Sequence, residues 1–266
     1  MRILLIIAGL ALLPGCFGNQ TDVASLDMNF AKTSLGFRNT GNLSSGTLYL
    51  WDQAEGQNSL VRIASDIPLV ERQPNPPGNR VATSVTGFAI QTSAQLTDAA
   101  IGEIQSEVIN SVSFSSTNAI TLENPQPERA MSATYAAQRR EHEANPGETS
   151  NPFVSWRVAD ATQQPDRYKY VLLNNAVLAS AESLSYNNEA GTTFDFDVPT
   201  GDGVNLNVRF NDSSSQSCTE TVAGQRATCY ISAKVYRVFL NEANNLDYAP
   251  VAASNNALAD AFRRLN

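Results

Sequence analysis

The chain of 266 residues contains a single histidine, three cysteines and three lysines. One histidine excludes the histidine-rich zinc sites of metallohydrolases, which take two or three imidazole ligands. His142 lies within residues 139–143, near the end of a polar segment, and this position is typical of an exposed residue at a helix end. A general base at His142 is the alternative interpretation.

The signatures of two large enzyme classes are also missing. The sequence has neither the Gly-x-x-x-x-Gly-Lys nor the Gly-x-Gly-x-x-Gly pattern that cradles phosphates. Residues 41–46, Gly-Asn-Leu-Ser-Ser-Gly, lack the Gly-x-Ser-x-Gly spacing of a nucleophile elbow. These absences favour a non-enzymatic protein over a zinc, serine or nucleotide-dependent hydrolase, and no cofactor is expected.

Basic residues are scarce, with 18 Lys and Arg against 26 Asp and Glu. The lysines and arginines form no basic block of the kind that binds phosphate backbones. The acidic balance disfavours nucleic acid and anionic lipid surfaces as partners. Attachment to a membrane would therefore have to come from another source.

Long hydrophobic runs are confined to the N-terminus. Arg2 precedes an apolar run over residues 3–13, which Pro14 and Gly15 then break. The run is shorter than the ~20 apolar residues of a membrane-spanning helix. Its length and flanks predict a secretory signal peptide over residues 1–15.

The tetrapeptide Leu13-Pro14-Gly15-Cys16 resembles the lipobox of bacterial lipoproteins, and only its second residue departs from the usual pattern. The resemblance implies cleavage before Cys16, diacylation of its thiol and acylation of the new terminus. Phe17 stands where aspartate would be the inner-membrane retention signal in enteric-type bacteria, so the resemblance implies the outer membrane, facing the periplasm. Several acyl chains bind a bilayer far more firmly than the single chain whose binding is marginal. An ordinary secretory signal with an incidental cysteine is the alternative.

The two remaining cysteines are Cys218 and Cys229. In an exported chain this pair predicts a disulfide, because the compartment outside the inner membrane is oxidising. The bridge would close a loop of about a dozen residues and stabilise the fold by roughly 3 kcal/mol. Two free structural thiols are the alternative.

The body of the chain predicts an α+β fold that is mainly β, with an antiparallel, sandwich-like sheet or sheets and two or three peripheral helices. Residues 204–210 alternate cleanly between apolar and polar side chains, which indicates one buried and one wet face. Residues 230–240 are apolar on both faces and indicate a central strand. Further strands are predicted at 47–51, 60–63, 81–90, 153–158 and 168–172, and a hairpin at 112–122.

Three helices are predicted. Thr97 can cap a helix that begins at Asp98, because its hydroxyl can accept from a free amide of the first turn. A second, mostly polar helix is expected from residue 128 to about 143. The third is a short C-terminal helix that Asn255 or Asn256 would cap.

These segments predict five parts of the chain. The signal peptide of residues 1–15 is followed by a lipidated tether at 16–27, a strand-rich lobe with two helices at 28–145, an antiparallel β lobe with the disulfide at 146–242, and a C-terminal tail at 243–266. The boundary near 145 rests on two prolines and a glycine in residues 146–152.

Acidic side chains provide the one candidate metal site. Asp195 and Asp197 would share a strand face, Asp202 lies in a Gly-Asp-Gly turn, and Asp212 follows the next strand. Carboxylates gathered by a loop suit calcium, although the spacing matches no EF-hand. A glycosidase could use the same acids, but a pair of carboxylates is easily found among 26.

Aromatic side chains offer a second kind of site. Six of them alternate within predicted strands and could line a sugar-binding face or pack in the core: Trp51, Trp156, Tyr168, Tyr170, Tyr230 and Tyr236. The sequence therefore predicts a non-enzymatic interaction or assembly module of the cell envelope, anchored in the outer membrane through Cys16 and bound to an envelope protein. A glycan- or calcium-binding lipoprotein and an exported carboxylate-dependent hydrolase are the alternatives.

Overall fold

A computed structural model of the chain describes residues 22–41, 43–71, 77–93, 95–186, 189–190, 195–199, 205–210, 218–219, 224–242 and 245–265. The predicted signal peptide and the lipidation site Cys16 lie outside these residues. The fold is α+β and mainly β, as the sequence predicts. Among the described helices, none is both long and apolar enough to cross a membrane.

The strands are β1 (Asp22–Asp27), β2 (Lys32–Thr33), β3 (Gly36–Arg38), β4 (Leu48–Asp52), β5 (Ser59–Ala64), β6 (Val70–Glu71), β7 (Gly78–Ala82), β8 (Ala89–Gln91), β9 (Val112–Glu123), β10 (Tyr168–Ala179), β11 (Ala181–Tyr186), β12 (Glu189–Ala190), β13 (Asp195–Pro199), β14 (Asn205–Phe210), β15 (Ala227–Leu240) and β16 (Leu246–Val251). The helices are α1 (Asp98–Ser111), α2 (Pro127–Ala144), α3 (Pro152–Ser155), α4 (Val158–Gln163) and α5 (Asn255–Arg263).

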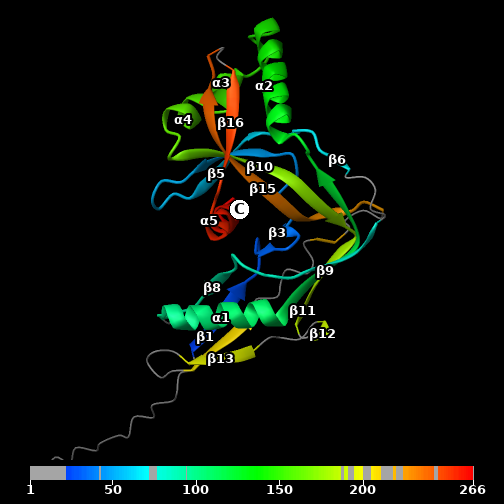
Figure 1. Cartoon of the computed structure of the whole chain (residues 1–266), viewed down its shortest axis with the longest axis vertical. Helices are drawn as coiled ribbons and strands as arrows, with labels where there is room; N and C mark the ends of the chain where they lie inside the picture. The colour runs from blue at the N-terminus through cyan, green and yellow to red at the C-terminus, as the bar shows by residue number, and fades with distance from the viewer. Residues whose placement is uncertain are drawn as a thin grey trace, which may run out of the picture.

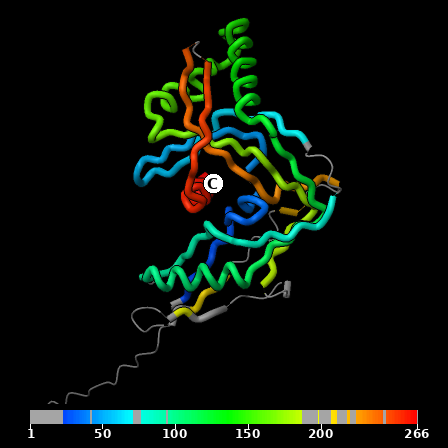
Figure 2. The backbone as a smooth tube through the Cα atoms, viewed as in Figure 1, coloured from blue at the N-terminus to red at the C-terminus, as the bar shows by residue number. Residues whose placement is uncertain are grey.

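Two sheets organise the molecule. The larger follows the order β12-β11-β9-β10-β15-β3-β2, with β16 added to β15, β4 beside β10, β5 beside β4, and β6 and β7 beside β9. The smaller has the order β13-β14-β1-β8. Figures 1 and 2 show an elongated molecule in which the long strands β9, β10 and β15 connect two halves. We call them the α2 half, which contains α2, α3, α4 and β16, and the α1 half, which contains α1 and the smaller sheet.

The sheet of the α2 half is buried on both faces. Neighbouring residues of one strand therefore enter different cores, as Leu50 and Trp51 of β4 do. Helices α2 and α4 cover the first core, and α5 covers the second. This double coverage explains why β15 carries apolar residues on both faces, and it confirms the central position that the sequence predicts for this strand.

The α1 half has a separate core. Ala100, Ile104 and Val108 form the buried face of α1, and Thr97 caps the helix by accepting from the amide of Ala100 at 3.2 Å. The sequence predicts antiparallel sheets, and the smaller sheet departs from this in one pair, because β1 and β14 are parallel. Parallel pairing is possible because a large part of the chain separates these two strands.

The predicted hairpin at residues 112–122 is wrong, because β9 is one continuous strand through this region. Its first half pairs with β11 and β7, and its second half pairs with β10 and β6. Asn118 adopts a left-handed φ of 54° in the middle of the strand. Asparagine tolerates this conformation, so the turn-forming residues bend the strand without reversing it.

The predicted strand at residues 153–158 is also wrong. Pro152 begins α3, and the side chain of Asn151 caps it by accepting from the amide of Phe153 at 2.9 Å. Arg157, at a left-handed φ of 52°, separates α3 from α4. Trp156 and Val158, which lie where α3 meets α4, are both buried. Their spacing of two residues is the same as that of buried residues in a strand, which explains the wrong prediction.

The parts of the chain predicted on either side of residue 145 share one sheet, since β10 pairs with both β4 and β9. The predicted C-terminal tail supplies β16 to the same sheet and α5 to its core. Ser254 caps α5, in place of Asn255 or Asn256. Within the described residues, α1, α2 and α5 correspond to the three predicted helices, and the short helices α3 and α4 are added to them because the segment 152–163 is helical.

Candidate binding groove beside helix α2

The six aromatic side chains that could have formed a sugar-binding face lie in the core. All six are at most 7 % exposed, and Trp156 is fully enclosed. The indole Nε1 of Trp156 donates to Gln138 Oε1 at 2.7 Å, and the hydroxyl of Tyr170 donates to the carbonyl oxygen of Trp156 at 2.6 Å. A sugar therefore has no access to these rings, and this form of the glycan-binding prediction is wrong.

The acidic residues of the predicted calcium site are only partly described. Asp195 and Asp197 lie on β13, opposite Arg209 and Asn207 of β14 in the strand register. Asp202 and Asp212 lie outside the described residues. Within the described part of the chain, no group of three or more His, Cys, Asp or Glu side chains could hold a metal ion.

The two cysteines predicted to pair do so. Cys218 and Cys229 form a disulfide, and both residues are fully buried. The bridge attaches residue 218 to β15, the central strand of the large sheet. His142 is partly exposed near the end of α2, and its Nδ1 lies 3.0 Å from the carbonyl oxygen of Thr149.

A buried ion pair joins two strands of the larger sheet. Arg38 Nε donates to Glu182 Oε1 at 2.8 Å, and the Tyr230 hydroxyl donates to the same oxygen at 3.0 Å. Burial raises the pKa of Glu182, and the positive charge of Arg38 opposes this rise. Because Arg38 and Glu182 are almost completely buried, the pair connects β3 to β11 within the core.

A surface cavity lies between α2 and the hairpin formed by β15 and β16. Its volume is about 450 Å³, within the range of ligand sites in proteins. Tyr135, Ala136 and Leu246 provide its apolar surface, while Arg140 and Asp247 are charged groups of its wall. We call this cavity the α2 groove.

The apolar face of α2 holds one wall of the groove in place. Met131 and Tyr135 are one helical turn apart and buried against the sheet. The rings of Tyr135 and Trp156 meet edge to face with centroids 5.2 Å apart. Burial raises the pKa of the Tyr135 hydroxyl, and Arg139 opposes this rise. The groove wall is therefore anchored by packing, whereas Arg139 and Arg140 on the outer side are exposed.

No local sequence pattern predicts the α2 groove. Its lining comes from residues 132–140 and 241–247, which are far apart in the chain and meet only when β16 pairs with β15. The sequence does predict that α2 lies on the surface, because the helix is mostly polar and has a single narrow apolar stripe.

Comparisons with known proteins assign no family. No protein-family model matches the chain, and no curated protein is similar to it in sequence. Among solved structures, the chain is similar to a bacterial gasdermin from Bradyrhizobium tropiciagri, at 10 % identity and a TM-score of 0.30, over 84 % of this chain and 88 % of that one. A similarity at this level transfers neither fold nor function.

Proposed function

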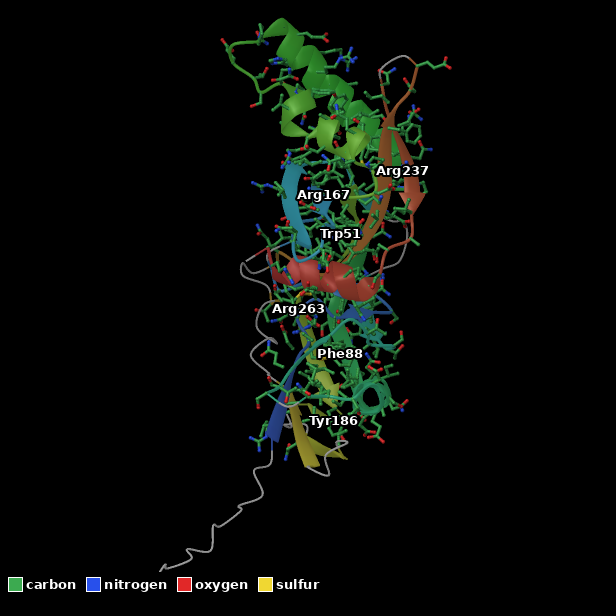
Figure 3. All side chains as sticks on the ribbon, turned by 90° about the vertical axis from the view of Figure 1, so that its left-hand side faces the viewer. Trp51, Phe88, Arg167, Tyr186, Arg237 and Arg263 are labelled. Carbon is green, nitrogen blue, oxygen red and sulfur yellow. A yellow bond between two sulfur atoms is a disulfide. The ribbon has the colours of Figure 1, made fainter. Side chains whose placement is uncertain are left out.

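We propose that the protein is a lipoprotein of the outer membrane that presents the α2 groove to a protein partner in the cell envelope. The proposed anchor is the lipobox-like sequence ending at Cys16. The observation that carries the proposal is the position of the groove relative to β1. Strand β1 includes residues 22–27 of the predicted tether and belongs to the α1 half, and the groove lies at the opposite end of the long axis (Figures 1 and 3).

This arrangement supports a role in contacting a partner. A chain attached through residue 16 would have its α1 half near the bilayer, because few residues separate Cys16 from β1. At ~3.3 Å per residue, the stretch from residue 16 to residue 22 spans at most about 20 Å when extended. The α2 half would then face away from the membrane surface.

Exposed apolar side chains on the α2 half also support a protein partner. Phe153 and Val154 of α3 are 42 % and 67 % exposed, and Phe239 and Leu240 at the end of β15 are 44 % and 40 % exposed. Each of these side chains could add apolar contact area to a bound partner. The mixed charges of Arg140 and Asp247 would select a partner with complementary groups.

Site-specific photocrosslinking in the native envelope tests this role. A photoreactive residue at Ala136 in the groove should give one discrete protein adduct, and the same residue at Ala99 should not. Both alanines are exposed on helices, but Ala99 lies on α1 at the other end. Arg140→Glu should abolish the adduct from position 136. Equal adducts from both positions, or no adduct from position 136, would exclude the groove as the contact surface.

The anchor is tested separately. Metabolic labelling with a fatty acid should mark the protein, and Cys16→Ser should remove the label. Persistent labelling would contradict lipidation at Cys16 without affecting the crosslinking result. The two parts of the proposal can therefore fail independently.

A further inference from the structure

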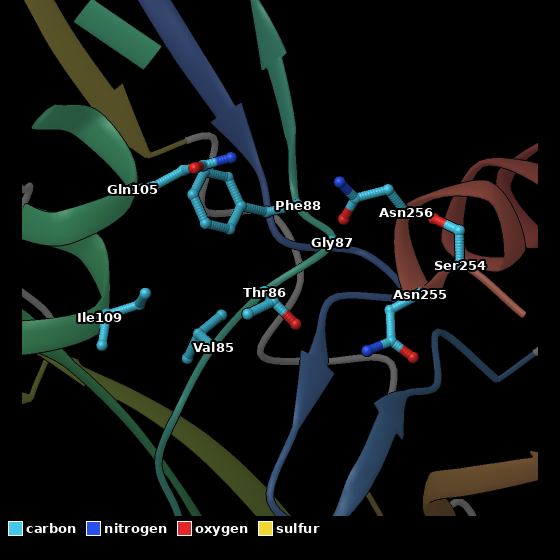
Figure 4. Close-up of a pocket in the computed structure, with 9 residues that line it drawn as sticks. All are labelled: Val85, Thr86, Gly87, Phe88, Gln105, Ile109, Ser254, Asn255 and Asn256. Carbon is cyan, nitrogen blue, oxygen red and sulfur yellow. The ribbon is translucent and has the colours of Figure 1, made fainter. Parts of the chain in front are cut away.

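A second cavity lies where α5 meets the α1 half (Figure 4). It has a volume of about 340 Å³ and is lined by residues 85–88, by Gln105 and Ile109 of α1, and by residues 254–256 at the start of α5. We call it the junction cavity. It does not overlap the α2 groove, and none of its lining residues belongs to the sequence-predicted sites.

The segment at the base of the junction cavity is fixed by contacts with α5. Gly87 has a left-handed φ of 68°, and a Cβ built there would lie 3.5 Å from the Cβ of Ala259. The guanidinium of Arg263 donates to the carbonyl oxygen of Gly87 at 2.5 Å, and its Nε lies 3.6 Å from Asp27 Oδ2. These contacts join α5 to two segments of the α1 half, so the cavity is formed in the free protein.

None of the nine residues that line the junction cavity is charged. Thr86, Gln105, Asn255 and Asn256 provide a hydroxyl and three amides, which together donate and accept hydrogen bonds. Ordinary anionic ligands such as phosphates would find no cationic side chain in this lining. The chain has 44 charged residues, and none of them lines this cavity. A lining without charged side chains favours a neutral ligand.

The apolar groups of the lining are segregated from the amides of α5. In Figure 4, Phe88 and Ile109 lie on the side of α1, while Asn255 and Asn256 lie on the side of α5. A sugar ring has the matching chemistry, because its C–H face packs against an aromatic or aliphatic side chain and its hydroxyls bond to amides. Ligand sites commonly combine an apolar wall with a few placed polar groups.

We infer that the junction cavity binds a small neutral saccharide. Gln105 and Asn256 would hydrogen-bond its hydroxyls, and Phe88 would pack against its apolar face. This site differs from the aromatic strand face considered from the sequence, whose rings are enclosed. The inference does not depend on the α2 groove or on lipidation.

Ligand-observed saturation-transfer NMR on the purified full-length chain tests the inference, with maltose and N,N′-diacetylchitobiose as probes. At least one disaccharide should bind, and Gln105→Ala or Asn256→Ala should each weaken binding about fivefold to tenfold, as expected for one lost hydrogen bond. Gln53→Ala is the matched control, since Gln53 is also an exposed glutamine but lies in the α2 half. It should leave the affinity unchanged.

A second variant tests the site without removing a polar group. Ile109→Trp adds bulk at a position that is 42 % exposed on α1, so it should obstruct the cavity while the helix remains folded. Circular dichroism verifies the fold of each variant. Binding that survives both Gln105→Ala and Ile109→Trp would overturn the inference. So would the absence of binding by both disaccharides, or binding of an uncharged tripeptide in their place.

Discussion

Arg38 Nε and Glu182 Oε1 are joined by a 2.8 Å hydrogen bond in which both side chains are almost completely buried. The two residues come from β3 and β11, which are separated by most of the chain. Removing one member leaves a buried charge without its counterion, which costs about 3–5 kcal/mol. We therefore expect Arg38→Met to lower the free energy of unfolding by about this amount.

Urea denaturation measures this loss, and a second variant identifies its cause. Arg38→Met combined with Glu182→Leu removes both charges and should recover most of the lost stability, because no buried carboxylate remains. Losses that simply add in the double variant would show that the two side chains contribute independently. That result would contradict an energetically coupled pair.

Asp52 gives a pH-dependent contribution to stability. Arg167 donates to its carboxylate through Nε at 2.9 Å and Nη2 at 2.8 Å, and these hydrogen bonds lower the pKa of Asp52 from its ordinary value of 3.8. A lowered pKa means that the unfolded chain binds the proton more readily. The contribution is therefore complete above pH 3.8 and disappears as the pH falls through the lowered pKa.

NMR titration of the Asp52 carboxyl carbon measures this shift directly. The pKa of Asp52 should lie below 3.8 in the native chain and rise towards that value in Arg167→Ala. Arg237→Ala removes another exposed arginine from the same half and serves as the control. An unchanged pKa in Arg167→Ala would contradict the assignment of the shift to this ion pair.

Asn58 joins the turn between β4 and β5 to α5. Its Oδ1 accepts from Trp51 Nε1 at 2.8 Å, and its Nδ2 donates to the carbonyl oxygen of Ala257 at 3.0 Å and to Asp260 Oδ2 at 2.7 Å. Asn58→Ala leaves the buried indole N–H without its acceptor, which costs about 1–3 kcal/mol. Thermal unfolding and amide exchange should show a less stable chain in which α5 exchanges faster.

The control for Asn58→Ala is Asn245→Ala, at an exposed residue in the connection between β15 and β16. A surface change of this kind should alter stability by less than about 0.5 kcal/mol. If α5 exchanges equally fast in both variants, the proposed link through Asn58 is incorrect.

Two glycines should respond in opposite directions to the same substitution. Gly36 has φ +123°, and a Cβ there would lie 2.5 Å from the backbone oxygen of Ile231. Gly36→Ala should therefore destabilise the chain by about 1–3 kcal/mol. Gly102, in α1, has open space around an added Cβ, so Gly102→Ala should stabilise by up to about 1 kcal/mol. Denaturation midpoints that shift in the same direction would contradict this distinction.

Local patterns predicted several elements because the relevant interactions are close in sequence. Thr97 and Asp98 mark the start of α1 since the cap bonds an amide three residues away. The apolar run at 230–240 predicts a central strand because both faces of β15 are covered. The two cysteines predict their disulfide because Cys16, the third cysteine, is the predicted lipidation site and leaves them no other thiol to pair with.

Other features depend on contacts between distant segments. The alternation at 153–158 suits a strand, yet a proline start, an asparagine cap and the left-handed Arg157 produce two short helices. Residues 115–118 suit a turn, yet pairing on both sides keeps β9 continuous. In both cases the tertiary partners outweigh a weak local preference.

Composition, periodicity and the scarcity of cysteine are enough to predict the α+β character of the body, its acidic charge and its disulfide. Which polar residues face a cavity depends instead on how distant segments pack together. Trp156 became part of the core, whereas Gln105 and Asn256 came together at the junction cavity. The reason is physical: burial and proximity arise from the packing of α5 and the long strands, and no local pattern records that packing.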